Sequence, residues 1–210
     1  MCRPRCQRLL VIPFAIMLSP FQAQKIRYLF TLNDRDGDGY ISHGDHVGQC
    51  DVFAEACGWA SDAPRASAHR EMLEGVWGMY LSAADPEDGP RVSEAAWMRL
   101  WTGFLAGVEA ERASGSSATM DALLDSVIRL FAILDERGTG RADAALWCAH
   151  MASLGVRNPQ AAFARIDVEG KGYLTAQDCA RLQAEFLLSE SPGAPGNHYF
   201  GVLPDVGVAV

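Results

Sequence analysis

The sequence predicts an all-α protein built from four helix–loop–helix units arranged in two pairs. Two observations support this prediction. The twelve residues Asp34–Asp45 alternate acidic side chains around a central glycine, between two stretches of helical apolar spacing. Three further loops of related pattern begin at Asp85, Asp135 and Asp167. Because one such unit leaves an apolar face open, repeated copies are expected to bury these faces against one another.

The composition describes a globular, acidic chain. It has 210 residues, of which 49% are hydrophobic, enough to bury one sizeable core or two small ones. The net charge is −8, and the only charges before Lys25 are three arginines, so the chain from residue 25 onward carries −11. This balance argues against a nucleic-acid partner and suits a protein that binds cations. Six scattered cysteines without CxxC or zinc-type spacing are expected to be free thiols.

The first 18 residues have two interpretations. Three arginines precede an apolar run ending at Leu18, which is the layout of a signal peptide, although the run is too short to span a membrane. Cleavage after Ala23 would place Phe21 where a small residue is preferred. Residues 1–18 are therefore either a leader or an extension that the fold does not need. We expect a cytoplasmic protein, and a secreted one if residues 1–23 are a signal peptide.

The first unit begins with a helix from Pro20 to Asn33, for which Ser19 is the expected N-cap. Its twelve-residue loop, the first loop, sets oxygen donors at the offsets that a hard cation such as Ca2+ requires, with Gly39 at the sharp turn. A helix to about Gly58 follows. The candidate metal ligands are Asp34, Asp36, Asp38, the Tyr40 backbone carbonyl, Ser42 (directly or through water) and Asp45.

Position 12 of the first loop is Asp45, where most Ca2+ loops have glutamate. Aspartate is shorter by one methylene and is expected to offer the ion one oxygen rather than two. One oxygen favours six-coordination, which suits Mg2+ better than Ca2+. We therefore expect a mixed site at which Mg2+ competes with Ca2+.

The second unit pairs a helix from about Pro64 to Ala83 with an exit helix to about Ala110. Its loop, Asp85–Ala96, is the second loop. Positions 5, 6 and 12 of that loop are Gly89, Pro90 and Ala96, so most ligands and the turn glycine are missing. The second loop is therefore predicted to be structural. The small residues that follow it suggest a linker over residues 113–118.

The third loop, Asp135–Leu146, follows a helix from about Met120 to Leu134. Arg137 at position 3 and Leu146 at position 12 replace carboxylates, so repulsion from the guanidinium should exclude a divalent ion.

The fourth loop, Asp167–Asp178, lies between a helix over Pro159–Ile166 and one ending near Ser189. Lys171 at position 5 predicts weak or absent binding. The candidate ligands of this weak second metal site are Asp167, Glu169, the Tyr173 backbone carbonyl and Asp178.

The units are expected to pair as an N-terminal half, 19–112, and a C-terminal half, 119–189, followed by a tail over 190–210. Adjacent loops of this kind pair through the residue at position 8, which predicts Ile41 opposite Val92 and Ala142 opposite Leu174. The second loop can then brace the first although it holds no ion.

The loops and several shorter motifs resemble one known EF-hand family. The motifs are Asp34–Gly39, Gly58–Trp59, Trp77, Arg91–Ser93 and Gly196–Leu203. Over about Leu18 to Leu203 the chain resembles the sarcoplasmic calcium-binding proteins, including calerythrin-like members, and the related luciferin-binding proteins and photoproteins. The resemblance implies a compact arrangement, a tail folded back on the body and Ca2+/Mg2+ buffering. A single intact loop argues against high buffering capacity.

The expected function is calcium binding at one strong site, as a buffer or as a module stabilised by the ion. One alternative is a carrier of an apolar small molecule, implied by the luciferin-binding relatives. Its support is a set of helical aromatic and histidine residues that could equally be ordinary core: Trp59, Trp77, Trp97, Trp101, Trp147, Tyr80 and His150. Another is a Ca2+ sensor for a protein target. The five histidines lack partners at catalytic or metal spacing and are expected on the surface or satisfied in the core, so no enzyme is predicted.

Overall fold

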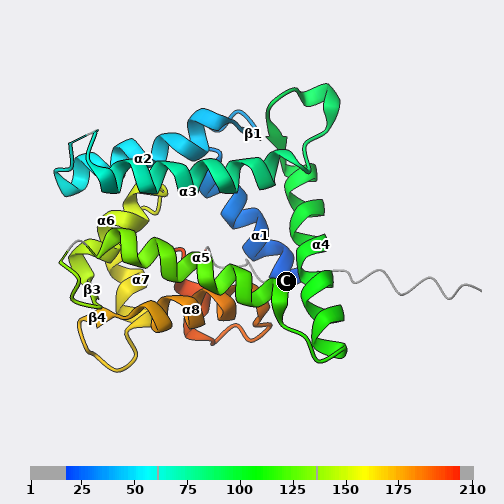
Figure 1. Ribbon diagram of the computed structural model, residues 1–210. Helices are drawn as coiled ribbons and strands as arrows, with labels where there is room; N and C mark the ends of the chain where they lie inside the picture. Colours follow the sequence, from blue (N-terminus) through cyan, green and yellow to red (C-terminus); the bar gives the residue numbers. More distant parts are fainter. Residues whose placement is uncertain (1–17, 61, 136, 204–210) are drawn as a thin grey trace, which may run out of the picture.

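The computed structural model describes residues 18–60, 62–135 and 137–203 (Figure 1). The predicted leader or extension falls almost wholly on residues 1–17, which lie outside this description. Eight α-helices are present in the described residues: α1 Pro20–Asn33, α2 His43–Cys57, α3 Pro64–Leu81, α4 Glu94–Ala113, α5 Ala118–Leu134, α6 Ala144–Ser153, α7 Pro159–Ile166 and α8 Ala176–Leu188. They flank the four loops that begin at Asp34, Asp85, Asp135 and Asp167, and the predicted all-α class is correct.

Four two-residue strands and two 3₁₀ turns complete the described structure. The strands are β1 Tyr40–Ile41, β2 Val92–Ser93, β3 Ala142–Asp143 and β4 Tyr173–Leu174, and the turns are η1 Pro86–Asp88 and η2 Pro195–His198. β1 pairs antiparallel with β2, and β3 with β4, in the predicted register: Ile41 lies opposite Val92, and Ala142 opposite Leu174. All four of these side chains are buried, so each ladder joins two loops over a small apolar contact.

The loop sequences also start the exit helices. Ser42 is the N-cap of α2, and Asp45 at the third helical position completes a capping box with it. Thr175 and Asp178 form the same box at the start of α8. Loop positions 9 and 12 are thus helix caps as well as candidate ligand positions, because each satisfies a backbone N–H that the first helical turn leaves free.

The two halves pack against each other along several helices. In Figure 1, α2 and α3 run side by side across the upper edge, α5 and α8 lie across the lower part, and α4 closes one side. α2 contacts α6, and α3 contacts α5, so helices of the N-terminal half touch helices of the C-terminal half. Trp97 of α4, 1% exposed, donates its indole N–H to the Ile26 carbonyl of α1 at 2.9 Å. One core therefore runs through both halves.

The part of the tail that is described, up to residue 203, lies on α1 and α8. Lys25 of α1 is 1% exposed and donates to the Ser189 carbonyl at 2.6 Å and to Asn197 Oδ1 at 3.3 Å. The Tyr28 hydroxyl donates to the Phe200 carbonyl at 3.0 Å. A Cβ on Gly196 would lie 2.6 Å from Glu185 Cβ, so only glycine allows this approach to α8. No helix in the described ranges is long and apolar enough to cross a membrane.

Candidate metal centre and central cavity

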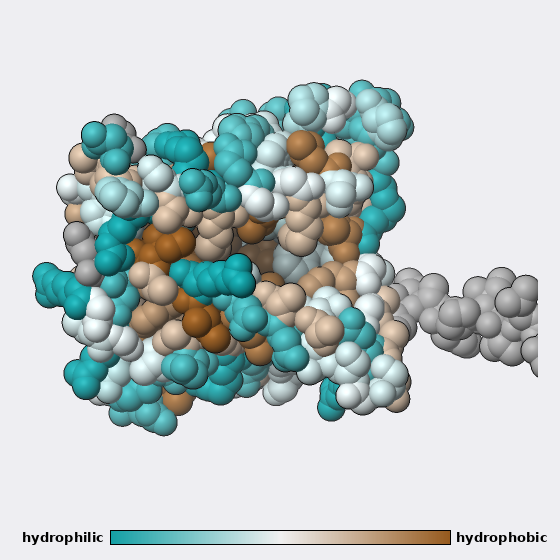
Figure 2. All heavy atoms as spheres, viewed as in Figure 1, coloured by the Kyte–Doolittle hydropathy of each residue, from teal (hydrophilic) through white to brown (hydrophobic). Residues whose placement is uncertain are grey.

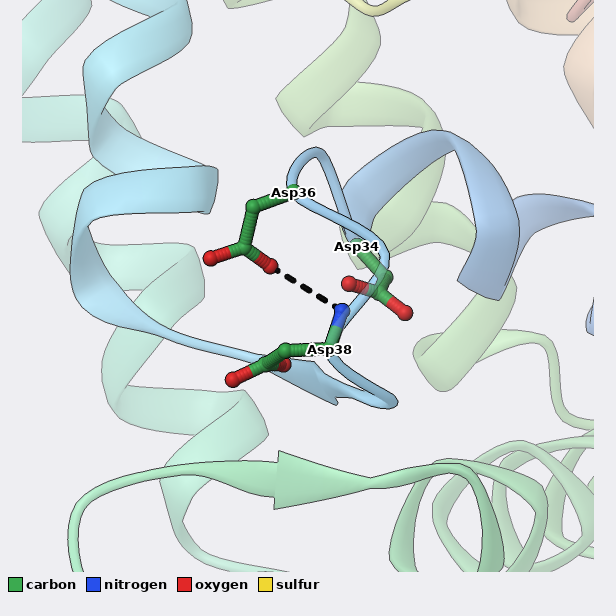
Figure 3. A group of neighbouring side chains, drawn as sticks. All are labelled: Asp34, Asp36 and Asp38. Carbon is green, nitrogen blue, oxygen red and sulfur yellow. Dashed lines mark hydrogen bonds between the residues drawn. The ribbon is translucent and has the colours of Figure 1, made fainter.

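The backbone of the first loop curls around its own aspartates. Asp34 Oδ2 accepts from the Gly39 N–H at 3.0 Å, Asp36 Oδ1 from the Asp38 N–H at 3.1 Å, and Asp38 Oδ1 from the Tyr40 N–H at 2.9 Å. Gly39 has φ +88°, a left-handed conformation that favours glycine. As Figure 3 shows, this curl gathers the three aspartates, with a carboxylate oxygen of each within 4.8 Å of the others.

The charge of this cluster is poorly compensated. Asp34 Oδ1 is buried and finds no hydrogen-bond partner among the described residues. The nearby Arg91 guanidinium of the second loop stands 3.9 Å from Asp38 Oδ2 and stacks on the Tyr40 ring at 4.0 Å. Arg35 of the first loop instead donates to the Ser153 carbonyl of α6 at 3.0 Å. Three converging carboxylates with one orphaned oxygen form a donor set that suits a hard cation.

The other predicted ligands of the first loop follow this cluster in the chain, in β1 and at the start of α2. Tyr40 is in β1, Ser42 caps α2, and Asp45 is 9% exposed. Asp45 Oδ2 accepts from the Ser42 N–H at 2.8 Å and from its hydroxyl at 2.5 Å. The structure thus gathers Asp34, Asp36 and Asp38 and holds Asp45 in the capping box through one of its two oxygens.

The second and third loops use their acidic groups for internal contacts. Asp85 pairs with Arg99 at 2.6 Å in the second loop. In the third, Asp135 accepts hydrogen bonds from Thr139 and from the Gly140 N–H. In the described part of the chain, three acidic side chains come together only in the first loop.

The fourth loop holds a cation of its own. Lys171 Nζ lies 2.9 Å from Asp178 Oδ2 and 3.2 Å from Glu169 Oε2. Burial alone would raise the pKa of Asp178, but hydrogen bonds from Lys171 and Thr175 lower it to about 2. Asp167 accepts from the backbone N–H groups of Lys171 and Gly172, and Tyr173 lies in β4. The three candidate carboxylates of the weak second site are thus already engaged.

A cavity of about 820 Å³ lies between the helices of the two halves. The face drawn in Figure 2 is hollowed near its centre, with apolar residues around the hollow. Of the aromatic residues considered in the sequence, Tyr80, Trp97 and Trp101 line the cavity. Its wall also includes residues near the aspartate cluster in the chain: Asn33, Arg35, Asp45 and His46.

Three buried histidines, His46, His69 and His150, line the cavity and are 3%, 1% and 7% exposed. His46 Nε2, both ring nitrogens of His69 and His150 Nδ1 have no hydrogen-bond partner in the described structure. Burial lowers the pKa of His46 and His69 to about 4 and that of His150 to about 3, so all three are neutral at pH 7. The sequence-based expectation of surface or satisfied core histidines fails most clearly for His69, which helix packing removes from water without supplying a partner to either ring nitrogen, whereas His46 Nδ1 lies 3.2 Å from Asn33 Oδ1.

Comparison with known proteins identifies the fold through solved structures and not through sequence. No family model and no curated protein matches the sequence. Among solved structures, okadaic acid binding protein 2.1 superposes with a TM-score of 0.67 at 18% identity, over 90% of this chain and 100% of that one. An apoaequorin complex with (S)-HM-daCTZ gives 0.65 at 18% identity, over 87% and 91% of the two chains. The sarcoplasmic calcium-binding protein from amphioxus gives 0.62 at 23%, over 90% and 100%.

These likenesses cover nearly the whole length of each compared chain. The protein therefore has the EF-hand fold shared by sarcoplasmic calcium-binding proteins and photoproteins, as the sequence resemblance implies.

Proposed function

We propose that this chain, which has the fold of the sarcoplasmic calcium-binding proteins, binds Ca2+ at one strong site in the first loop. The observation that carries the proposal is the convergence of Asp34, Asp36 and Asp38 within 4.8 Å, with Asp34 Oδ1 buried and unpaired in the described structure. The site would act as a weak buffer or stabilise the fold of a binding module. We propose a binding role rather than a catalytic one.

The remaining ligands would come from β1 and the start of α2. The Tyr40 carbonyl, Ser42 and Asp45 supply oxygens at loop positions 7, 9 and 12. Because Asp45 Oδ2 already accepts two hydrogen bonds from Ser42, its other oxygen is the one free to reach an ion. Ligation through one oxygen supports a six-coordinate site at which Mg2+ competes with Ca2+.

Counting bound ions tests this proposal. Native mass spectrometry should find one Ca2+ per chain, and calorimetric Ca2+ affinity should fall in millimolar Mg2+. Asp34→Ala should abolish binding. Asp85→Ala, at the same position of the second loop, is the control and should leave one ion bound. Stoichiometric Ca2+ on the Asp34→Ala protein would contradict a single strong site.

The central cavity supports a second function, a carrier of an apolar small molecule. Its volume of about 820 Å³ lies in the range of pockets for drug-sized ligands. Buried imidazoles without partners lose hydrogen bonds that a ligand or ordered water can supply. Two neighbours in the structural comparison bind small molecules by name, okadaic acid in one case and (S)-HM-daCTZ in the other.

A neutral fluorescent dye such as Nile red provides the test. We expect one dye molecule per chain, with increased emission in the apolar cavity. Ala122 of α5 lines the cavity and Ile128 of the same helix does not. Ala122→Phe should therefore weaken dye binding and Ile128→Phe should not. Equal affinity for both variants would mean that the dye binds elsewhere, and the carrier proposal would fail.

The sensor alternative has less support. A sensor exposes an apolar groove to its target when the ion binds. Here the tail up to residue 203 lies on α1 and α8, and Met72 and Met79 line the central cavity rather than a separate groove.

We also propose a cytoplasmic location. Cys50, Cys148 and Cys179 form no disulfide and are buried, which is usual in a reducing compartment. Mass spectrometry of the native N-terminus tests the alternative, since a first residue at or before Met17 excludes a cleaved signal peptide.

A further inference from the structure

The fourth loop differs from the first in what stands between its carboxylates. Position 5 is Asp38 in the first loop and Lys171 in the fourth. The Lys171 side chain is 27% exposed, and its ammonium lies within 3.2 Å of the carboxylates at positions 3 and 12, Glu169 and Asp178. A positive charge thus contacts the two side chains that would flank an ion in a working loop.

The first and fourth loops share several backbone and side-chain contacts. Position 1 accepts from the position 6 N–H in both, at 3.0 Å for Asp34 and 2.7 Å for Asp167. Positions 9 and 12 form a capping box in both. Each loop belongs to a pair in which an arginine stacks on the position 7 tyrosine, Arg91 on Tyr40 and Arg141 on Tyr173. The two loops differ at position 5, both in the charge of its side chain and in its backbone N–H, which bonds Asp36 in the first loop and Asp167 in the fourth.

The acidic groups of the two loops also differ in the hydrogen bonds that they accept. In the first loop, Asp34 Oδ1 is buried without a partner within the described residues. In the fourth, both oxygens of Asp167 accept backbone hydrogen bonds, from Lys171 and Gly172. Asp178 accepts from Lys171 Nζ and from Thr175. The fourth loop is satisfied as it stands, and the first is not.

We propose that the Lys171 ammonium takes the place of a metal ion in the fourth loop. The carboxylates of this loop are then neutralised by a side chain of the protein itself. A cation tethered to the loop is present at a high effective concentration, which lets it compete with free millimolar cations. The next step rests on the proposed first site. If the first loop binds an ion and Lys171 fills the fourth loop, only the N-terminal half responds to metal. The cavity is then lined both by Asp45 and His46, which belong to or follow the ion-dependent loop, and by residues of the C-terminal half such as His150.

Replacing Lys171 tests the proposal by counting ions. Lys171→Asp supplies a position 5 carboxylate, and Lys171→Arg keeps the charge as the matched control. Both are made alone and on an Asp34→Ala background, and bound Ca2+ is counted by native mass spectrometry and calorimetry. We expect Lys171→Asp to add one Ca2+ to each parent protein and Lys171→Arg to add none.

An unchanged count with Lys171→Asp overturns the proposal, whatever the Asp34→Ala parent binds. The number of Ca2+ ions bound by the Asp34→Ala protein itself tests the proposed first site. The proposals for the first and the fourth loop can therefore fail separately. Lys171→Met, which keeps length and removes charge, gives a measurement independent of ion binding. Without added metal it should unfold at a lower temperature than Lys171→Arg, because Glu169 and Asp178 lose their shared cation. Equal unfolding temperatures would make Lys171 an ordinary surface lysine and overturn the proposal.

Discussion

Asp45 serves the first loop in two ways, as a helix cap and as the proposed twelfth-position ligand. Its Oδ2 is committed to Ser42, so ligation through both oxygens would require the capping hydrogen bonds to be shared or broken. Glutamate also fits a capping box at this position and reaches further by one methylene. The choice between the two acids should therefore affect cation selectivity more than helix stability.

Asp45→Glu should raise Ca2+ affinity several-fold and weaken competition by Mg2+. The added reach allows bidentate ligation and seven-coordination, which Ca2+ accepts and Mg2+ does not. Titration calorimetry with and without millimolar Mg2+ measures both effects. Asp178→Glu in the fourth loop is the control and should change neither. Unchanged selectivity with Asp45→Glu would argue against ligation through position 12.

Arg91 is a second residue whose charge should tune the site. It stands 3.9 Å from Asp38 Oδ2 and is held by stacking on Tyr40. Since both side chains of the pair are partly exposed, we expect an effect of about 1 kcal/mol or less. Arg91→Gln should therefore raise Ca2+ affinity by up to about fivefold, most clearly at low salt.

Arg141→Gln provides the matched control for that change. Arg141 stacks on Tyr173 in the other pair at 4.4 Å and so occupies the corresponding position, away from the first loop. Calorimetry at low and high ionic strength should show no effect of this variant on Ca2+ affinity. If both variants change affinity equally, the effect arises from net charge and not from the Asp38 contact.

At the scale of elements, the capping boxes link loop chemistry to helix stability. Ser42 begins α2, and Thr175 begins α8 through the same hydrogen bonds. Ser42→Ala and Thr175→Ala should each lower the free energy of unfolding by about 1 kcal/mol, because one backbone N–H of the first turn loses its acceptor. Urea unfolding measures this cost.

The same two variants should differ in Ca2+ binding. Ser42→Ala removes a proposed ligand and the group that orients Asp45, so calorimetric affinity should fall. Thr175 lies in the fourth loop, where Lys171 is proposed to replace the ion. Thr175→Ala should therefore change neither the number of bound Ca2+ ions nor their affinity. A loss of affinity in Thr175→Ala would place a working metal site in the fourth loop.

Much of this element structure could be predicted because its causes are local. Ser19 and Pro20 mark the start of α1, and the position 8 residue Ile41 pairs with Val92 as expected. The Asp34, Asp36 and Asp38 cluster follows from loop spacing alone. The bounds of α1 and α7 match the predictions, whereas some other helix ends differ by up to three residues, as for α3, which ends at Leu81 rather than Ala83.

The cavity and its histidines could not be predicted in the same way. His46, His69 and His150 come from α2, α3 and α6, far apart in the sequence, and only the packing of the two halves brings them to one wall. The position of the Lys171 ammonium is a similar case. Its charge was evident from the sequence, but its contacts with both Glu169 and Asp178 depend on how the loop is curled.

At the scale of the whole molecule, the buried histidines make stability depend on pH. His69 and His150 have ring centroids 6.2 Å apart, and both pack on Phe53. His46 lies against Tyr80, with the charged or titratable groups His43, Glu74 and His69 close enough to influence it, and Arg70 influences His69. The folded pKa values of about 4, 4 and 3 lie below the ordinary value of 6.5.

The sign of the pH effect follows from that difference. Below pH 6.5 the unfolded chain takes up protons at these histidines and the folded chain does not, so the stability present above pH 6.5 is lost as pH falls toward 4. The expected slope is up to about 1.4 kcal/mol per pH unit for each histidine. Urea unfolding at several values between pH 7 and pH 5 measures it, in a range above the ordinary pKa of most carboxylates.

His69→Phe should reduce this slope, because the aromatic ring still packs on Phe53 and one proton uptake site is gone. His43→Phe is the comparison variant, because it removes a histidine that is exposed and pairs with Glu74 at 3.0 Å instead of lying buried. The same acid range should release a dye held in the cavity, since a protonated imidazole would face an apolar wall and a neutral ligand. If stability is flat between pH 7 and pH 5 and the dye stays bound, burial does not lower the pKa values of the three histidines. The cavity around them would then be hydrated rather than apolar.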